Sequence, residues 1–124
     1  MKKKILVVDD MYEFRRLTTI ILLSKYVVES AENGINALSI LHSGYLPDLI
    51  ICDLIMPVLR GEDFLDQLKN SWAFKDIPVI ILSGIDKSEE KIRLIKMGAC
   101  DYLEKPYNPA ELMVRIENAL KKVN

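Results

Sequence analysis

The sequence predicts an α/β protein: a doubly wound, five-stranded parallel sheet with helices on both faces, formed as one domain by residues 1–124. Short apolar runs alternate along the chain with longer amphipathic segments, which is typical of a parallel sheet. The runs are apolar at successive positions, as expected for strands that are buried on both faces. Right-handed crossovers then distribute the helices over the two faces of the sheet.

Each predicted strand is a short run rich in β-branched residues, too short for a helix. The second strand is the weakest, and the fifth is the shortest. They lie at residues 5–8, 27–31, 49–52 and 79–82, and around Tyr102 and Leu103.

The helices are predicted from apolar spacing and from residues that favour helix ends. The first extends from about residue 11 to residue 24 and is expected to share one apolar face among Phe14, Leu17, Thr18 and Ile21. The second follows a turn at Asn33 and Gly34, and the third follows Gly61. The fourth has Asp86 or Ser88 as its N-cap, with Gly98 just past its end.

The last helix has the clearest start. Asn108 is the predicted N-cap, Pro109 occupies the first helical position and Glu111 the third. Its predicted apolar face consists of Leu112, Ile116, Ala119 and Leu120.

Composition excludes several classes of function. The formal net charge is -1, so the chain lacks the basic field that nucleic-acid binding needs. The basic start is followed by an apolar run that stops at Asp9, short of the ~7–15 residues of a signal sequence. No segment approaches the ~20 apolar residues of a membrane span. Cys52 and Cys100 match no metal or disulfide spacing, and Cys52 is expected in the core. We therefore expect a cytoplasmic protein without direct contact to nucleic acid or membrane.

Polar side chains follow the predicted strands where a ligand is expected. In open α/β sheets ligands bind beyond the carboxyl ends of the strands. The residues found there are Asp9 and Asp10, Asp53, Ser83 and Lys105.

Three carboxylates at one edge repel one another unless a cation neutralises them. Mg²⁺ prefers such oxygen ligands together with water and phosphate oxygens. A carboxylate such as Asp53 can then attack a phosphoryl donor and form an acyl phosphate. Ser83 and Lys105 would supply a hydroxyl donor and a positive charge to the phosphoryl oxygens.

Each residue also has a simpler interpretation. Asp10 could cap the first helix, Ser83 and Gly84 could be turn residues, and Lys105 could be a solvated loop lysine. Asp53 ends a buried strand with no obvious helix to cap. The joint placement at one edge favours the functional interpretation.

The residues resemble the receiver domains of bacterial-type two-component response regulators, in particular a single-domain receiver of the chemotaxis-regulator type. The resemblance covers essentially the whole chain and rests on several segments in order. They are VVDD (7–10), DLIMP (53–57) followed by Gly61, PVIILSG (78–84), GA (98–99) and DYLEKPY (101–107).

The resemblance implies the flavodoxin-like strand order 2-1-3-4-5 and a role for each residue. Asp53 would accept the phosphoryl group, while Asp9, Asp10, Asp53 and the backbone carbonyl of Ile55 would bind Mg²⁺, with Mn²⁺ as a substitute. Ser83 and Lys105 would contact the phosphoryl group, and a cis peptide before Pro106 would direct Lys105 inward. Ser83 and Tyr102 would form the switch.

The implied donor is a sensor histidine kinase or a phosphotransfer protein. Signalling to a separate, unknown partner would use the surface of the fourth helix, fifth strand and fifth helix, about residues 92–112. Alternatively, the chain would pass the phosphoryl group onward in a relay. No output domain is expected in the sequence, and the protein would be a monomer or a phosphorylation-dependent dimer. It would catalyse its own phosphotransfer without being a turnover enzyme.

Two isoleucines set an expectation for the lifetime of the phosphorylated state. Ile55 and Ile85 occupy positions that flank the phosphoryl group in this family, and their apolar side chains should exclude attacking water. We predict slow self-dephosphorylation.

Other functions remain open at this point. An Mg²⁺-dependent phosphohydrolase with an aspartyl nucleophile shares this chemistry, although it usually needs a second carboxylate where Ile55 stands. An FMN-binding protein would need a phosphate-binding loop where Asp9 and Asp10 stand. A receiver-like interaction module without phosphorylation is disfavoured by the complete set of pocket residues.

Overall fold

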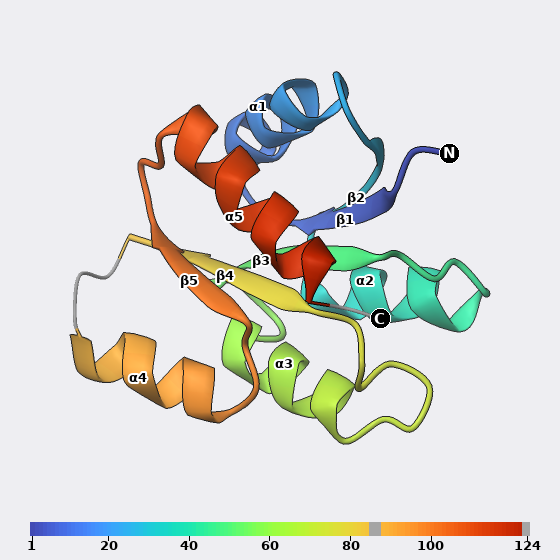
Figure 1. The fold of residues 1–124 in the computed structure, drawn as a ribbon. Coiled ribbons are helices and arrows are strands. Elements are labelled where there is room, and N and C mark those ends of the chain that lie inside the picture. Colours follow the sequence, from blue (N-terminus) through green and yellow to red (C-terminus); the bar gives the residue numbers. More distant parts are fainter. Residues whose placement is uncertain (85–87, 123–124) are drawn as a thin grey trace.

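A computed structural model of the chain describes residues 1–84 and 88–122. It contains a five-stranded parallel sheet of order β2-β1-β3-β4-β5, which confirms the predicted fold class and strand order (Figure 1). The strands are β1 (Lys4–Val8), β2 (Val27–Ala31), β3 (Leu49–Asp53), β4 (Val79–Ser83) and β5 (Asp101–Glu104).

Five helices connect and follow these strands within the described residues. They are α1 (Tyr12–Leu22), α2 (Gly34–His42), α3 (Gly61–Lys69), α4 (Ser88–Lys96) and α5 (Pro109–Lys121). Helices α1 and α5 cover one face of the sheet, and α2, α3 and α4 cover the other (Figure 1). Within residues 1–84 and 88–122, no helix is long and apolar enough to cross a membrane.

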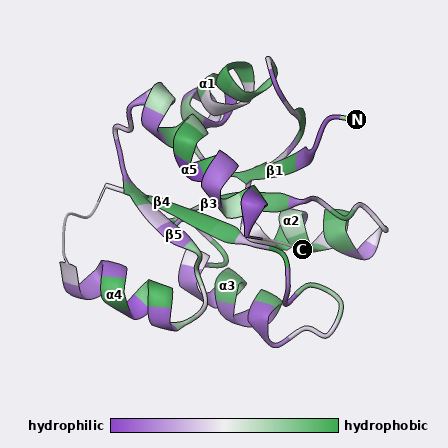
Figure 2. Ribbon diagram, in the orientation of Figure 1, coloured by the Kyte–Doolittle hydropathy of each residue, from purple (hydrophilic) through white to green (hydrophobic). Residues whose placement is uncertain are grey.

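The core consists of two apolar layers, one on each side of the sheet. Leu6, Ile50 and Ile81 point toward α2–α4, whereas Ile5, Ile51 and Ile80 point toward α1 and α5. All residues of β3 and β4 are buried, and their sequences are apolar up to the last residue of each strand, Asp53 and Ser83 (Figure 2). Edge strand β2 buries only Ala31 completely, in agreement with its weaker pattern.

Helix α5 begins as predicted. The Asn108 side chain accepts hydrogen bonds from the backbone N–H groups of Ala110 and Glu111, and Pro109 is the first helical residue. In α4, Ser88 is already the first helical residue, and the alternative N-cap Asp86 lies outside the described residues.

Two predicted core residues lie at the surface instead. Leu17 is 50% exposed, because the buried stripe of α1 runs through Thr18 and Leu22, and position 17 lies about 100° around the helix from position 18. From the sequence, the apolar pair Trp72 and Phe74 between α3 and β4 is expected to cover the edge of the core. Phe74 is buried there, whereas Trp72 is 87% exposed, with Lys75 Nζ 4.4 Å from its ring centroid.

Candidate functional site

The candidate site lies at the carboxyl ends of β1, β3, β4 and β5. Parallel register aligns these ends: Val8 pairs with Cys52, Asp53 with Leu82, and Ser83 with Glu104. The residue after each aligned end therefore reaches the same edge of the sheet. Cys52 itself is fully buried, which raises the pKa of its thiol well above the ordinary value and confirms it as a core residue.

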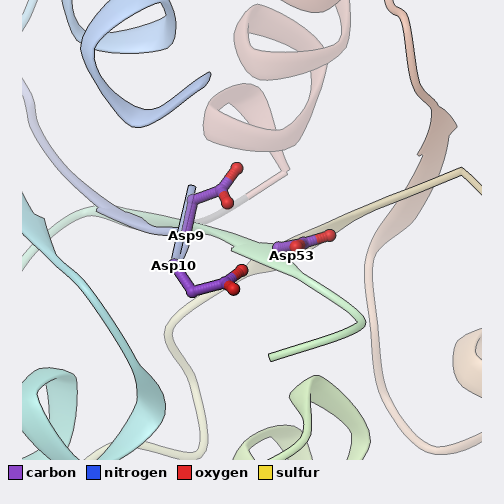
Figure 3. Close-up of side chains that lie close together, drawn as sticks. All are labelled: Asp9, Asp10 and Asp53. Atoms are coloured by element: carbon purple, nitrogen blue, oxygen red, sulfur yellow. The ribbon is translucent and has the colours of Figure 1, made fainter. Parts of the chain in front are cut away.

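Three carboxylates meet at this edge (Figure 3). One oxygen each from Asp9, Asp10 and Asp53 lies within 4.8 Å of the others. Asp9 and Asp53 are buried, being 2% and 7% exposed, while Asp10 is exposed to solvent. This set of oxygen donors can hold a hard divalent cation with one side open to water.

Lys105 reaches the same pocket from the end of β5. Its Nζ lies 3.0 Å from Asp9 Oδ2 and 3.4 Å from Asp53 Oδ1, and its side chain is only 10% exposed. Lys105 is therefore not a solvated loop lysine. The Lys105–Pro106 peptide bond is cis, as the resemblance implied.

Among the carboxyl groups of residues 1–84 and 88–122, Asp53 has the most strongly shifted pKa. Burial raises its pKa from 3.8 to about 6; Lys105 lowers the pKa, and the neighbouring Asp9 and Asp10 raise it. A buried carboxylate with a strongly shifted pKa is typical of a functional site. A cation or a neutralising reaction at this position relieves the repulsion.

The turn after β1 is ordered by Asp9 and Arg15. Asp9 Oδ1 accepts a hydrogen bond from the backbone N–H of Met11, and the Arg15 guanidinium donates one to the Asp9 carbonyl oxygen at 2.8 Å. The N-cap of α1 is Met11, whose side chain makes no capping hydrogen bond. Asp10 is thus not the helix cap that its position also allowed.

The loop between β3 and α3 is held close to Asp53 by Gly61. A Cβ atom at this glycine would lie 2.5 Å from the carbonyl oxygen of Asp53 and 2.8 Å from Leu54 Cα. In the same loop Val58 adopts φ +72°, a left-handed conformation that is unfavourable for a β-branched residue. Ile55 is 47% exposed, and Ile85 lies outside the described residues.

The two predicted switch residues are both buried. Ser83 is the last residue of β4 and is fully buried. Tyr102, in β5, is 4% exposed and belongs to the core layer that also contains Leu94 of α4 and Ala99.

Two contacts near Lys105, one cation–π contact and one hydrogen bond, were not predicted from the sequence. Phe14 of α1 places its ring 4.4 Å from Lys105 Nζ, and Tyr107 bonds to Thr18 of α1. The sequence offered no signal for either, because the partners are about 90 residues apart along the chain.

Comparison with known proteins agrees with the fold and the pocket. Residues 5–117 match the family model of the response regulator receiver domain. The chain belongs to this family. It is 38% identical over 99% of its length to "Probable transcriptional regulator ycf27" of Porphyridium aerugineum, of which it covers 50%. It is 32% identical over its full length to "Phosphate regulon transcriptional regulatory protein PhoB" of Escherichia coli, of which it covers 54%.

Solved receiver structures superpose over almost the whole chain. A putative response regulator from Chloroflexus aurantiacus has a TM-score of 0.92 and 30% identity, covering 98% of this chain and 100% of that one. The chemotaxis response regulator CheY4 of Vibrio cholerae has a TM-score of 0.88 and 30% identity, covering 96% and 99%.

The comparisons identify the chain as a receiver domain. It belongs to two-component signalling and is not a classical turnover enzyme. Receiver domains bind Mg²⁺ in an acidic pocket, and Asp9, Asp10 and Asp53 form a group that could hold it here. The chain spans about half the length of these two curated relatives.

Proposed function

We propose that this receiver domain accepts a phosphoryl group on Asp53 from a sensor histidine kinase or a phosphotransfer protein, in an Mg²⁺-dependent step. The observation that carries the proposal is the position of the Asp53 carboxylate. It ends a fully buried strand, lies 3.4 Å from Lys105 Nζ and shares a 4.8 Å cluster with Asp9 and Asp10.

Asp9, Asp10, Asp53 and the backbone carbonyl of Ile55 would hold the cation, with Mn²⁺ as a substitute. When bound, the cation would neutralise the carboxylates and the incoming phosphoryl oxygens. The carboxylate ligands on this chain fit a hard cation because all of them are oxygens.

The transfer itself uses residues of this chain. An Asp53 carboxylate oxygen attacks phosphorus, an O–P bond forms, and the P–N bond of the donor phosphohistidine breaks. The electron pair of that bond returns to the imidazole nitrogen, which becomes neutral or takes a proton from solvent. Lys105 would shift from its carboxylate partners to pair with a phosphoryl oxygen, and the Ser83 hydroxyl would donate to another.

Phosphorylation would then bias a switch made of Ser83 and Tyr102 and alter the α4-β5-α5 surface. Helix α4 is suited to moving, because Leu94 is its only fully buried residue. The surface carries a hollow of about 300 Å³ lined mostly by polar side chains of Lys91, Tyr102, Glu104, Glu111 and Arg115. We propose that an unknown protein partner, or a second copy after phosphorylation, binds there, or that phosphate is relayed onward.

The proposal extends to the domain's location, its ligands and the lifetime of its phosphorylated state. Residues 1–124 form one receiver domain that acts in the cytoplasm and, with a net charge of -1, does not bind nucleic acid itself. Self-dephosphorylation is slow, because the side chain of Ile55 offers no hydrogen bond to an attacking water. The domain does not turn over a substrate.

The proposal is tested by loading the protein with acetyl phosphate and Mg²⁺. Intact-mass analysis should show the addition of one phosphoryl group, mapped to Asp53 by borohydride trapping, and no addition in Asp53→Asn or after chelation of the metal. Asp66→Asn, an exposed carboxylate on α3, is the matched control and should be labelled like the wild type. Labelling at another residue, or none, would contradict the proposal. Sustained release of more than one equivalent of phosphate from a phosphate ester would favour the phosphohydrolase.

A further inference from the structure

We propose that Phe14 and Thr18 of α1, together with Tyr107, position the Lys105 side chain for phosphoryl transfer. We call these three residues the α1 brace. The inference rests on the proposed phosphorylation of Asp53 and assigns residues outside the pocket to the placement of its lysine.

The first part of the brace is a contact between a cation and an aromatic ring. Lys105 Nζ lies 4.4 Å from the centroid of the Phe14 ring, on a side chain that is only 10% exposed. The negative face of an aromatic ring attracts an ammonium group, and the attraction is stronger where water is excluded. Phe14 therefore gives the ammonium a third neighbour besides Asp9 and Asp53.

The second part is a hydrogen bond between Thr18 Oγ1 and the Tyr107 hydroxyl, at 2.6 Å. Thr18 is 1% exposed, so its hydroxyl is shielded from water and needs a hydrogen-bond partner within the protein. A threonine inside a helix commonly bonds back to the carbonyl four residues earlier, as Thr19 does to Arg15 at 2.8 Å. Thr18 instead reaches across to the segment that follows β5.

The two contacts hold both ends of one short segment. Phe14 and Thr18 are four residues apart and share a face of α1, which lies beside the start of α5 (Figure 1). Lys105 and Tyr107 are separated by Pro106 alone, and the Tyr107 ring packs against the core layer under α1 and α5. At its other side the segment is tied to the sheet by a hydrogen bond from the Lys105 backbone N–H to the Ser83 carbonyl, at 2.8 Å.

This arrangement matters because lysine is a flexible donor. Its side chain has several rotatable bonds, and the ammonium must stay beside Asp53, within reach of the oxygens of an incoming phosphoryl group. A displacement of about 1 Å of a reacting or binding group can lower a rate by as much as about 100-fold. Holding the start and the end of residues 105–107 against one helix face restricts that displacement.

The test compares phosphorylation rates at saturating acetyl phosphate and excess Mg²⁺. We expect Phe14→Leu, Thr18→Val and Tyr107→Phe each to lower the rate about 3- to 10-fold. Phe14→Tyr keeps an aromatic face and should retain a rate within about twofold of wild type. Thr19→Val removes a neighbouring hydroxyl that bonds only within α1, and serves as the matched control with an unchanged rate. Thr18→Val and Tyr107→Phe should not be additive, because each removes the same hydrogen bond.

A Lys105→Met background separates positioning from simple loss of packing. There the brace substitutions should leave the remaining rate unchanged while still lowering the melting temperature. An equal fold-loss in that background, or unchanged rates in the wild-type background, would overturn the proposal.

An NMR measurement separates failure of the brace from failure of the proposed function. Relaxation of the Lys105 side-chain methylene groups should show increased mobility in Phe14→Leu and not in Thr19→Val, whether or not Asp53 can be phosphorylated. Unphosphorylated wild-type protein would contradict the proposed function alone, and unchanged Lys105 mobility in Phe14→Leu would contradict the brace alone.

Discussion

Replacing Asp53 by asparagine should stabilise the metal-free protein, although it removes the proposed phosphoacceptor. Asp53 is 7% exposed, and burial together with Asp9 and Asp10 raises its pKa from 3.8 to about 6 despite the opposing effect of Lys105. At 1.36 kcal/mol per tenfold change in acidity, the ionised carboxylate costs the folded state about 3 kcal/mol above neutral pH. Asparagine keeps the shape of the side chain and carries no charge.

The sign of the pH dependence follows from the raised pKa. The folded protein binds the Asp53 proton more tightly than the unfolded chain, so this contribution to stability is present at low pH and is lost as the pH rises through about 6. The advantage of Asp53→Asn should therefore be about 3 kcal/mol at about pH 7.5 and should shrink to about 1 kcal/mol at about pH 4.5. Both values already include the attraction of Lys105, because that attraction lowers the pKa of Asp53. In the variant Asp9 still pairs with the Lys105 ammonium at 3.0 Å.

The assay is urea unfolding of both proteins at the two pH values in the presence of a chelator. Asp66→Asn, on the exposed side of α3, is the control and should change stability by less than about 0.5 kcal/mol at either pH. Adding Mg²⁺ should stabilise the wild type more than Asp53→Asn, because a ligand is missing in the variant. A variant less stable than wild type at pH 7.5, or an advantage that grows toward pH 4.5, would refute the reasoning.

Three further predictions concern the loop after β3. Gly61→Ala should lower the free energy of unfolding by about 1–3 kcal/mol, because its Cβ would lie 2.5 Å from the Asp53 carbonyl oxygen. Gly84→Ala is the control and should unfold like wild type, because nothing lies within 4 Å of its Cβ; equal stabilities of the two variants would contradict the close approach. Val58→Gly should raise the free energy of unfolding by roughly 0.5–1 kcal/mol, because glycine adopts the left-handed φ of +72° without strain and the valine side chain is already 81% exposed. A lower stability than wild type would show that the valine conformation is not strained. Ile55→Asn should speed phosphate loss from the loaded protein several-fold by offering water a hydrogen bond, and an unchanged rate would exclude Ile55 from control of the lifetime.

The fold was predictable because its signals are local. The apolar runs of β3 and β4 are buried on both faces, and the start of α5 is marked by Asn108 and Pro109 within two positions. The predictions of burial failed at Leu17 and Trp72, two apolar residues that lie at the surface. Trp72 lies in the connection after α3 with its side chain exposed and the Lys75 ammonium near its ring. Leu17 lies just beside the buried stripe of α1.

The candidate site was predictable for a related reason. A parallel sheet carries the ends of its strands to one edge, so the residue type that follows each apolar run is enough to assemble Asp9, Asp10, Asp53 and Lys105. The positions of Gly61 and Val58 depend instead on the path of the loop, which a valine in particular gives no reason to expect.

The sequence by itself determined the α/β alternation, the placement of Asp53 at a strand end and the charged residues at the neighbouring strand ends, because strand periodicity and strand ends depend on neighbouring residues. Only the tertiary structure decided which of these groups touch and how strongly they perturb one another. The pKa of Asp53 depends on its burial and on a lysine that approaches from another strand. The contacts of Phe14 with Lys105 and of Thr18 with Tyr107 likewise join segments about 90 residues apart, and such contacts exist only once α1 and the end of β5 are packed on the same face of the sheet.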